Sequence, residues 1–198
     1  MEIHPIYSLT EPSHKEVFRL IRAESGISRA EIARRLGLQR STVTYILRSL
    51  FERSLILECG TGKSTDRGGK KPTLVKVNDY EGYSVGYEQL LRKANIVITN
   101  LSGSVVVSET VPNGKNLRPN HKEWVQLAIS NIHAFLKERS ITQESVFGIG
   151  IAFPGLVDSK SGAVVYSVSP AFLDFPYLEI LKKQIKVPAF IANDANAC

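Results

Sequence analysis

Polar side chains suited to contacting nucleic acid gather between residues 40 and 48. Arginine reaches guanine edges or phosphates, small hydroxyl groups contact either, and the methyl group of threonine can meet that of thymine. Helical spacing places these side chains on one face, opposite the apolar residues of the same stretch. One interpretation is a surface that reads double-stranded DNA, and the other is the solvated face of an ordinary three-helix bundle. The candidates are Arg40, Ser41, Thr42, Thr44, Tyr45 and Arg48.

A second basic cluster lies in the stretch from Gly60 to Lys71, which is rich in glycine, lysine, serine and arginine. Its cationic side chains can meet phosphates or the minor groove, and glycine lets the backbone come close to DNA. A solvated hairpin loop is the alternative interpretation. The candidates are Lys63, Arg67, Lys70 and Lys71.

Carboxylate and amide side chains follow two apolar stretches in the second half of the chain. Asp158 lies shortly after residues 146–152, and Asn193 and Asp194 directly follow residues 188–192. Ligands of open α/β sheets bind at strand ends of this kind. An aspartate there can accept a hydrogen bond from a substrate hydroxyl, act as a general base, or cap the next helix. The spacing alone leaves these roles open.

Short elements must position the basic residues of the first 80. Apolar residues recur at helical spacing, Ser28 and Glu31 have capping-box spacing, and Gly37 closes the second helix. Three helices with a glycine turn, followed by two strands and a basic loop, predict a winged helix-turn-helix domain over residues 1–80. The expected helices cover residues 13–26, 28–37 and 40–50, and the expected strands cover 55–58 and 73–77.

The order of elements after the expected linker at residues 80–82 is typical of an α/β domain, here predicted over residues 81–198. Three strands form a meander, a long amphipathic helix around Trp124 covers them, and residues 146–152 form a nearly continuous apolar strand. The expected strands cover 83–87, 95–101, 104–110, 146–152 and 188–192, and the expected helices cover 120–139 and 178–184.

Charge and composition narrow the class of protein. The chain has 198 residues and a formal net charge of +6, and residues 1–80 carry 14 basic and 9 acidic side chains. A polyanionic partner is therefore expected at the N-terminal part. Two cysteines, no signal-peptide pattern and no apolar run of membrane-spanning length exclude a disulfide scaffold and a transmembrane protein. A cytoplasmic protein is the default expectation.

Three motifs in order resemble the ROK family of repressors and sugar kinases. They are residues 148–158 (GIGIAFPGLVD), residues 187–197 (VPAFIANDANA) and, for the winged-helix domain of the repressor branch, residues 68–74 (GGKKPTL). The resemblance implies an actin-like ATPase fold, related to ribonuclease H, with a sugar site between two lobes. It makes Asp194 the sugar-contacting aspartate, which is the catalytic base in kinases, with Asn193 and Gly155 as neighbours.

Departures from the family pattern favour a repressor. Kinases of the family carry Asp-x-Gly-Gly-Thr after the first strand, where this chain has Glu88-Gln89-Leu90-Leu91-Arg92. Two leucines replace the glycines that admit ATP phosphates. We therefore expect no enzyme activity and no cofactor. The family's asparagine and tryptophan before the Asn-Asp motif are replaced by Val168 and Phe172, so the sugar is expected to differ or bind weakly.

Because the chain ends at Cys198, the second lobe of the family and its cysteine-rich zinc motif are expected to be absent. No metal is therefore predicted. The short length has two alternative explanations, a naturally truncated protein and a fragment of a longer one. The leading hypothesis is a sugar-responsive repressor that binds a two-fold DNA operator as a homodimer. A sugar kinase is the first alternative. A regulatory fragment that binds DNA or dimerises without sensing sugar is the second.

Overall fold

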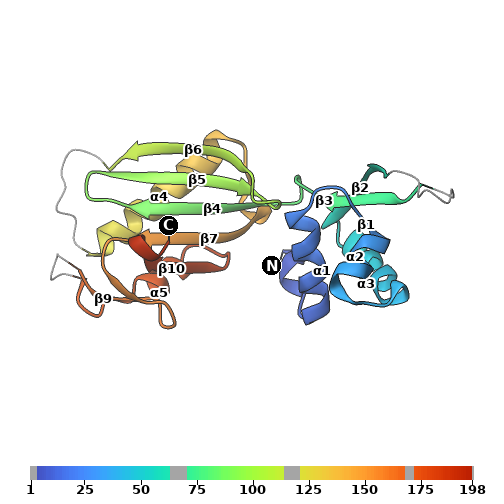
Figure 1. Cartoon of the computed structure of the whole chain (residues 1–198). Coiled ribbons are helices and arrows are strands. Elements are labelled where there is room, and N and C mark those ends of the chain that lie inside the picture. The colour runs from blue at the N-terminus through green and yellow to red at the C-terminus, as the bar shows by residue number, and fades with distance from the viewer. Residues whose placement is uncertain (1–3, 63–70, 114–120, 168–171, 198) are drawn as a thin grey trace. The chain divides into compact units, whose positions relative to one another are not determined.

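The structure, a computed structural model, describes residues 4–62, 71–113, 121–167 and 172–197. They form two compact units, Met1–Glu81 and Gly82–Cys198, each with its own core (Figure 1). The chain thus divides immediately after Glu81. Lys63, Arg67 and Lys70, which the sequence nominates for DNA contact, lie outside the described residues, as does Val168.

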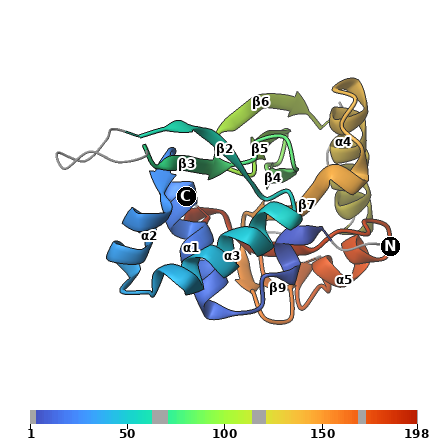
Figure 2. The same ribbon diagram turned by 90° about the vertical axis from the view of Figure 1, so that its right-hand side faces the viewer.

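The first unit is a small helical core with a three-stranded antiparallel sheet in the order β1-β3-β2. Figure 2 shows its helices grouped beside the β2–β3 hairpin. The strand β1 was not predicted from sequence, and its register places Ile27 opposite Val75. The elements are η1 (Pro5–Ser8), α1 (Pro12–Ala23), β1 (Ile27–Ser28), α2 (Arg29–Leu36), α3 (Arg40–Glu52), β2 (Ile56–Thr61) and β3 (Thr73–Val77).

The ends of α2 are fixed by the two residues that the sequence nominated. The Ser28 side chain accepts a hydrogen bond from the Glu31 backbone N–H at 3.2 Å. Gly37 ends the helix in the left-handed region at φ 64°, where glycine carries no steric penalty. The Glu31 carboxylate does not complete the capping box, because it binds arginines instead.

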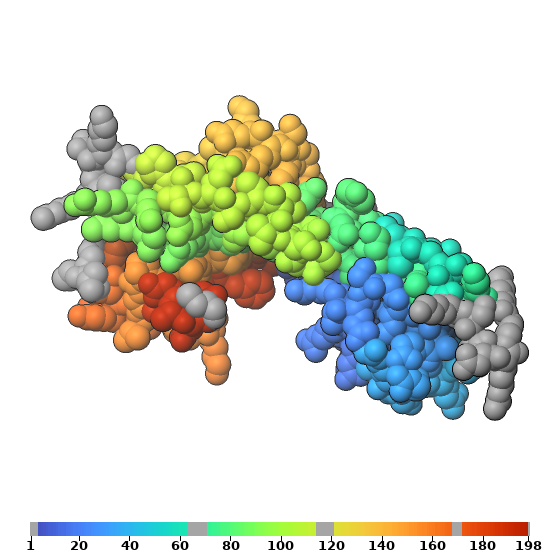
Figure 3. Space-filling model, turned by 45° about the horizontal axis from the view of Figure 1, so that its top comes forward, coloured from blue at the N-terminus to red at the C-terminus, as the bar shows by residue number. Residues whose placement is uncertain are grey.

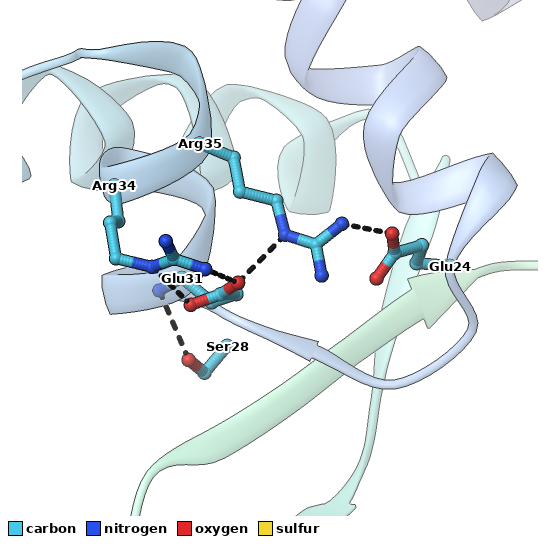
Figure 4. Close-up of polar contacts among 5 residues, drawn as sticks. All are labelled: Glu24, Ser28, Glu31, Arg34 and Arg35. Atoms are coloured by element: carbon cyan, nitrogen blue, oxygen red, sulfur yellow. Dashed lines mark hydrogen bonds and ion pairs between the residues drawn. The ribbon is translucent and has the colours of Figure 1, made fainter.

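An ionic network joins α2 to the residue that follows α1 (Figure 4). Glu31 accepts hydrogen bonds from Arg34 Nε at 2.9 Å and from Arg35 Nε at 2.7 Å. Arg35 also binds Glu24. The hydrogen bonds from Arg34 and Arg35 lower the pKa of Glu31 from 4.5 to about 2. Glu31 and Glu24 thus offset the charges of two of the three arginines of α2, Arg34 and Arg35.

The second unit is built on a five-stranded sheet in the order β10-β7-β4-β5-β6. The strands β4, β5 and β6 are consecutive in the sequence, and β5 pairs antiparallel with both β4 and β6. The strand β7 pairs in parallel with both β4 and β10. A short β8–β9 hairpin, which was not predicted from sequence, follows β7. The strands are β4 (Tyr83–Gln89), β5 (Lys93–Asn100), β6 (Val105–Pro112), β7 (Val146–Phe153), β8 (Leu156–Asp158), β9 (Ala163–Tyr166) and β10 (Ala189–Asn193).

Two helices share the core on one face of this sheet. Trp124 and Ile132 of α4 (His121–Glu138) and Leu181 of α5 (Tyr177–Lys182) are buried in the same cluster as the strand residues Ile96 and Ile149. The short helices η2 (Gln143–Ser145) and η4 (Asp194–Asn196) flank β7 and β10. This is the mixed α/β arrangement of a ribonuclease H-like lobe that the sequence predicted.

Replacing Ser28 with alanine should destabilise the first unit alone. The change removes the side-chain acceptor at the start of α2, which typically costs about 1 kcal/mol of the free energy of unfolding. Urea unfolding followed by circular dichroism should show an earlier transition. The fluorescence of the sole tryptophan, Trp124 in the second unit, is the internal control and should be unaffected.

The ionic network predicts an acid-sensitive contribution to stability. The pKa of Glu31 is lower in the folded protein than its ordinary value of 4.5, so its contribution to stability is present above pH 4.5 and is lost as the pH falls toward about 2. Between pH 4.5 and about 2, the unfolding midpoint of the first unit should therefore fall less steeply in Glu31→Gln than in wild type. Glu16→Gln, which removes an exposed carboxylate of α1, is the matched control. An equal acid slope in wild type and Glu31→Gln would contradict the role of the network.

Candidate DNA interface and candidate sugar loop

The polar face of α3 is fully available to a partner. The six side chains nominated from sequence are all exposed, whereas Val43, Ile46, Leu47 and Leu50 on the opposite face are buried. The buried residues fix the rotation of α3 about its axis, because turning the helix would expose apolar surface. The structure thus presents Arg40, Ser41, Thr42, Thr44, Tyr45 and Arg48 together on one surface.

A groove of about 710 Å³ runs between this face and the winged sheet. On one side it is bounded by α3 and the start of α2, and on the other by the beginning of β3. Besides four of the nominated residues, it includes Arg29, which the sequence analysis did not select. The lining comprises Arg29, Ala30, Arg40, Ser41, Thr44, Leu47, Arg48, Phe51, Glu52, Glu58, Pro72, Thr73 and Val75.

The groove carries both signs of charge. Arg48 donates from Nε to Glu52 at 2.9 Å, and both side chains are mostly exposed. An exposed pair of this kind contributes only about 0.2–1 kcal/mol, so Arg48 can exchange Glu52 for a phosphate or a base at small cost. Glu58 is a second carboxylate along the same groove. Of the two nominated arginines of α3, Arg48 is therefore the one that pairs with a carboxylate among the described residues.

Tyr45 is the most conspicuous exposed aromatic side chain of α3, with 66% of its surface accessible. Its ring meets the ring of His14 edge-on, with centroids 6.0 Å apart. His14 is itself buried in α1 and lies 3.1 Å from the Glu11 carboxylate. The contact steadies one edge of the tyrosine while its remaining surface stays available.

The base of the wing is described on both strands. The Gly62 backbone N–H donates to the Pro72 carbonyl at 2.8 Å, which extends the pairing of β2 and β3 toward the loop. Lys71, the last of the four nominated wing residues and the one described by the structure, is exposed at this point. It lies beside Pro72 and Thr73, which line the groove.

The second unit brings two of the three nominated sugar residues into contact. Because β7 and β10 are parallel neighbours with Phe153 opposite Asn193, the segments after both strands leave the sheet at the same edge. Asn193 Nδ2 donates to the Gly155 carbonyl at 2.8 Å, and Asn193 Oδ1 accepts from the Ala195 N–H at 3.0 Å. Asp194 begins the turn and is half-buried. This contact group is called the sugar loop below.

Position 155 needs a glycine because neighbouring atoms leave no room for a Cβ, and not because of its backbone φ angle. A Cβ at this position would lie 2.6 Å from the Tyr166 carbonyl oxygen and 3.3 Å from Ser167 Cβ. Ser167 is buried and donates to the Pro154 carbonyl at 3.3 Å. Tyr166 and Ser167 therefore shape the sugar loop, although no short-range pattern in the sequence indicated them.

Asp158, the other aspartate considered from sequence, has a local structural role. Its Oδ1 accepts a hydrogen bond from the Lys160 N–H at 3.0 Å. A hydrogen bond from Ser161, followed by that from Lys160, lowers its pKa. Asp158 is exposed in the β8–β9 turn. Asp158 therefore stabilises this turn and caps no helix, because the next element is the strand β9.

A second cavity, of about 420 Å³, lies over the sheet face that α4 and α5 leave uncovered. In Figure 3 the green surface formed by residues 83–112 faces the viewer. Glu88 and Asn95 meet there at 2.5 Å, and Asn95 accepts from Thr110 Oγ1 at 2.7 Å. Gly155, Asn193 and Asp194 are not among the residues that line this cavity.

The turn between β4 and β5 lacks the features of a phosphate cradle. The Leu90 N–H donates to the Lys93 carbonyl at 3.1 Å, closing a tight turn that contains Leu91 and Arg92. Leu91 is 60% exposed, so a bulky apolar side chain projects where the kinase motif has glycine. Backbone amides of non-glycine residues in ordinary conformations do not converge on an anion as readily as a glycine loop does.

Fold and surface together define a winged-helix unit joined to an α/β lobe of the ribonuclease H type. Comparison with known families agrees for each part. Residues 11–56 match the winged helix-turn-helix DNA-binding family, and residues 91–198 match the ROK family. Since the second match covers more than half of the chain, the protein belongs to the ROK family, and the resemblance identified from its three motifs is confirmed.

Two curated relatives that match most of this chain are, by name, a repressor and a transcriptional regulator. The xylose repressor of Bacillus subtilis is 31% identical over 186 residues, which cover 93% of this chain and 47% of the relative. The DNA-binding transcriptional dual regulator NagC of Escherichia coli is 29% identical over 179 residues, covering 90% and 43%. The chain therefore spans about half the length of the curated relatives that it matches.

A solved structure shows the same fold over nearly the whole chain. It is described as a ROK family transcriptional regulator homologous to the E. coli MLC protein, and it superimposes with a TM-score of 0.70. The match covers 93% of this chain and 46% of that chain at 22% sequence identity. The predicted fold class, a winged helix-turn-helix followed by one α/β lobe, is confirmed. Within the described part of the chain, every helix is too short or too polar to span a bilayer.

Removing the carboxylate of Glu52 should strengthen DNA binding. Glu52→Gln frees Arg48 and removes a negative charge from the groove. The expected gain in affinity is about twofold at low salt, in line with an exposed pair worth about 0.2–1 kcal/mol. Fluorescence anisotropy with a labelled duplex measures it. Glu16→Gln, an exposed position on α1, is the matched charge control, and weaker binding by Glu52→Gln would refute the placement of DNA in the groove.

Proposed function

We propose that this chain is the DNA-binding part of a sugar-responsive transcriptional repressor that binds a two-fold operator as a homodimer. The observation that carries the proposal is the surface of α3: six exposed polar side chains are held beside the wing by an apolar face that is buried. Relatives named as xylose repressor and DNA-binding transcriptional dual regulator support the class.

The helix α3 enters the major groove in this proposal, and the wing meets the DNA backbone or the minor groove. Arg40 and Arg48 read base edges, while Ser41, Thr42, Thr44 and Tyr45 contact bases or phosphates. Lys71 binds phosphate, as do Lys63, Arg67 and Lys70 in the loop outside the described residues. Residues 1–80 act as the DNA-binding domain and residues 81–198 as the first lobe of a sugar-binding domain.

Gly155, Asn193 and Asp194 contribute to a sugar site on this lobe. Support comes from the hydrogen bond of Asn193 to Gly155, which brings two of the three residues together at one edge of the sheet. Asp194 follows them directly and offers a carboxylate for sugar hydroxyls. A sugar that binds one conformation of the lobe better than another would shift the equilibrium between DNA-binding and released states.

The protein acts as a regulator and not as an enzyme in this proposal. Support comes from the names of the relatives and from the leucine-containing β4–β5 turn, which offers little room for phosphates. A cytoplasmic location accords with the DNA target and with the absence of a membrane-spanning helix from the described residues.

Anisotropy titrations on DNA from upstream of the protein's own gene, with a scrambled duplex as reference, test the DNA assignment. Arg40→Ala should lower the preference for the specific duplex, since a base contact is worth about 1–3 kcal/mol. Lys71→Ala should weaken binding to both duplexes and reduce the slope of log affinity against log salt by about 0.9. Equal affinity of wild type for the two duplexes would overturn the proposed function.

The same titrations with a panel of sugars test the sensing lobe. A sugar that weakens specific binding by wild type, but not by Asp194→Asn, supports the sugar loop. Specific binding that no sugar alters would restrict this chain to the regulatory fragment considered from sequence.

A further inference from the structure

Arg29 connects the start of α2 to the polar face of α3. Its Nη1 donates to Thr44 Oγ1 at 3.0 Å. Thr44 Oγ1 in turn donates to the backbone carbonyl of Arg40 at 2.7 Å. Arg29 was not nominated from sequence, because it belongs to the helix before α3 and lies 15 residues from its partner. Its guanidinium nevertheless lines the groove beside α3.

These two bonds decide which chemistry Thr44 has left for DNA. A hydroxyl group carries one hydrogen, and that of Thr44 is already given to the Arg40 carbonyl. It therefore cannot donate to the acceptors that guanine, adenine and thymine present in the major groove. One lone pair is occupied by Arg29. Both of these hydrogen bonds engage the hydroxyl group. The methyl group is therefore the part of the exposed Thr44 side chain that is left to contact a base.

Both ends of the contact are held by rigid elements. Arg29 begins α2 directly after the capping residue Ser28. Thr44 follows the fully buried Val43 on α3. Since a threonine side chain has few rotamers and its orientation is set by what its hydroxyl binds, the Arg29 bond holds the hydroxyl on one side and leaves the methyl group in a constant position.

We propose that Arg29 is a positioning residue for sequence recognition: by holding the Thr44 hydroxyl, it makes Thr44 select a thymine through the thymine's 5-methyl group. The proposal rests on the proposed function, since it requires α3 to lie in the major groove. It assigns to Thr44 an apolar contact with one base rather than a hydrogen bond, and to Arg29 a role exerted through Thr44.

Replacing thymine with uracil isolates this contact, because uracil lacks only the 5-methyl group. In the specific duplex, each thymine is replaced singly, and affinity is measured by anisotropy. Wild type should lose about fourfold in affinity at one thymine of each half-site, the value of one methyl group removed from water. Thr44→Ser, which keeps the hydroxyl and removes the methyl, should bind the thymine and uracil duplexes equally.

Two further variants separate positioning from other roles. Thr44→Val removes the hydroxyl that Arg29 holds, but valine in a helix has one strongly preferred rotamer, whereas threonine divides between two. The valine methyl group therefore needs no partner to hold it, and this variant should retain the thymine preference; loss of the preference would show that the hydroxyl reads the base. Arg29→Gln should reduce the thymine preference to less than twofold, and Arg29→Lys, which restores a cationic donor, should recover part of it. A phosphate contact by Arg29 would instead lower affinity for thymine and uracil duplexes alike, reduce the salt slope by about 0.9 and leave their ratio unchanged, which overturns the proposal.

The outcomes distinguish this inference from the proposed function. If wild type prefers the specific duplex to the scrambled one but shows no uracil-sensitive position, or one that Thr44→Ser does not abolish, the inference fails and the proposed function stands. If wild type shows no preference for the specific duplex, both fail. Circular dichroism of each variant, whose substituted positions are exposed, confirms that the first unit is folded.

Discussion

The burial of one face of α3 is the constraint on which the DNA-binding unit depends. Val43, Ile46, Leu47 and Leu50 are each at most 6% exposed, and full burial of an aliphatic side chain contributes roughly 1.5–3 kcal/mol. A helix rotates by about 100° per residue, so a slip of one position would bring Thr44 and Arg48 into the places of Val43 and Leu47. The same buried face therefore determines which side chains α3 exposes, and α1, α2 and the sheet are arranged around it.

A comparable constraint shapes the second unit through strand register. The parallel pairing of β7 with β10 places Phe153 beside Asn193, and from there a short turn brings Gly155 within reach of the Asn193 amide. The β8–β9 hairpin then returns Tyr166 to Gly155 so closely that a side chain has no room. The sugar loop is thus assembled by backbone geometry, with the half-buried Asp194 following it directly.

Local signals in the sequence were sufficient for most elements and insufficient for pairwise contacts. The periodicity of α3, the cap at Ser28 and the strand at residues 73–77 all follow from short-range patterns, and the structure shows them at or near the predicted bounds. The strand β1 has only two residues and owes its existence to β3, so no periodicity could reveal it. The β8–β9 hairpin and the Arg29–Thr44 bond likewise arise from tertiary packing between separate segments. Which side chains of α3 are exposed was therefore predictable, whereas what holds each of them in place was not.

The bond between Arg29 and Thr44 bears on how specificity diverges among duplicated genes. Residues such as Ser41 and Thr42 are exposed and outside the core. In the proposed interface, single substitutions at these positions would change the preferred operator at little cost to folding. Thr44 is different because its orientation is shared with a residue on another helix. A substitution at either Arg29 or Thr44 removes the hydrogen bond between them. Substitutions at these two positions are therefore expected to occur together among related genes. Operator divergence should then proceed stepwise at most positions of α3 and by paired replacement at this one.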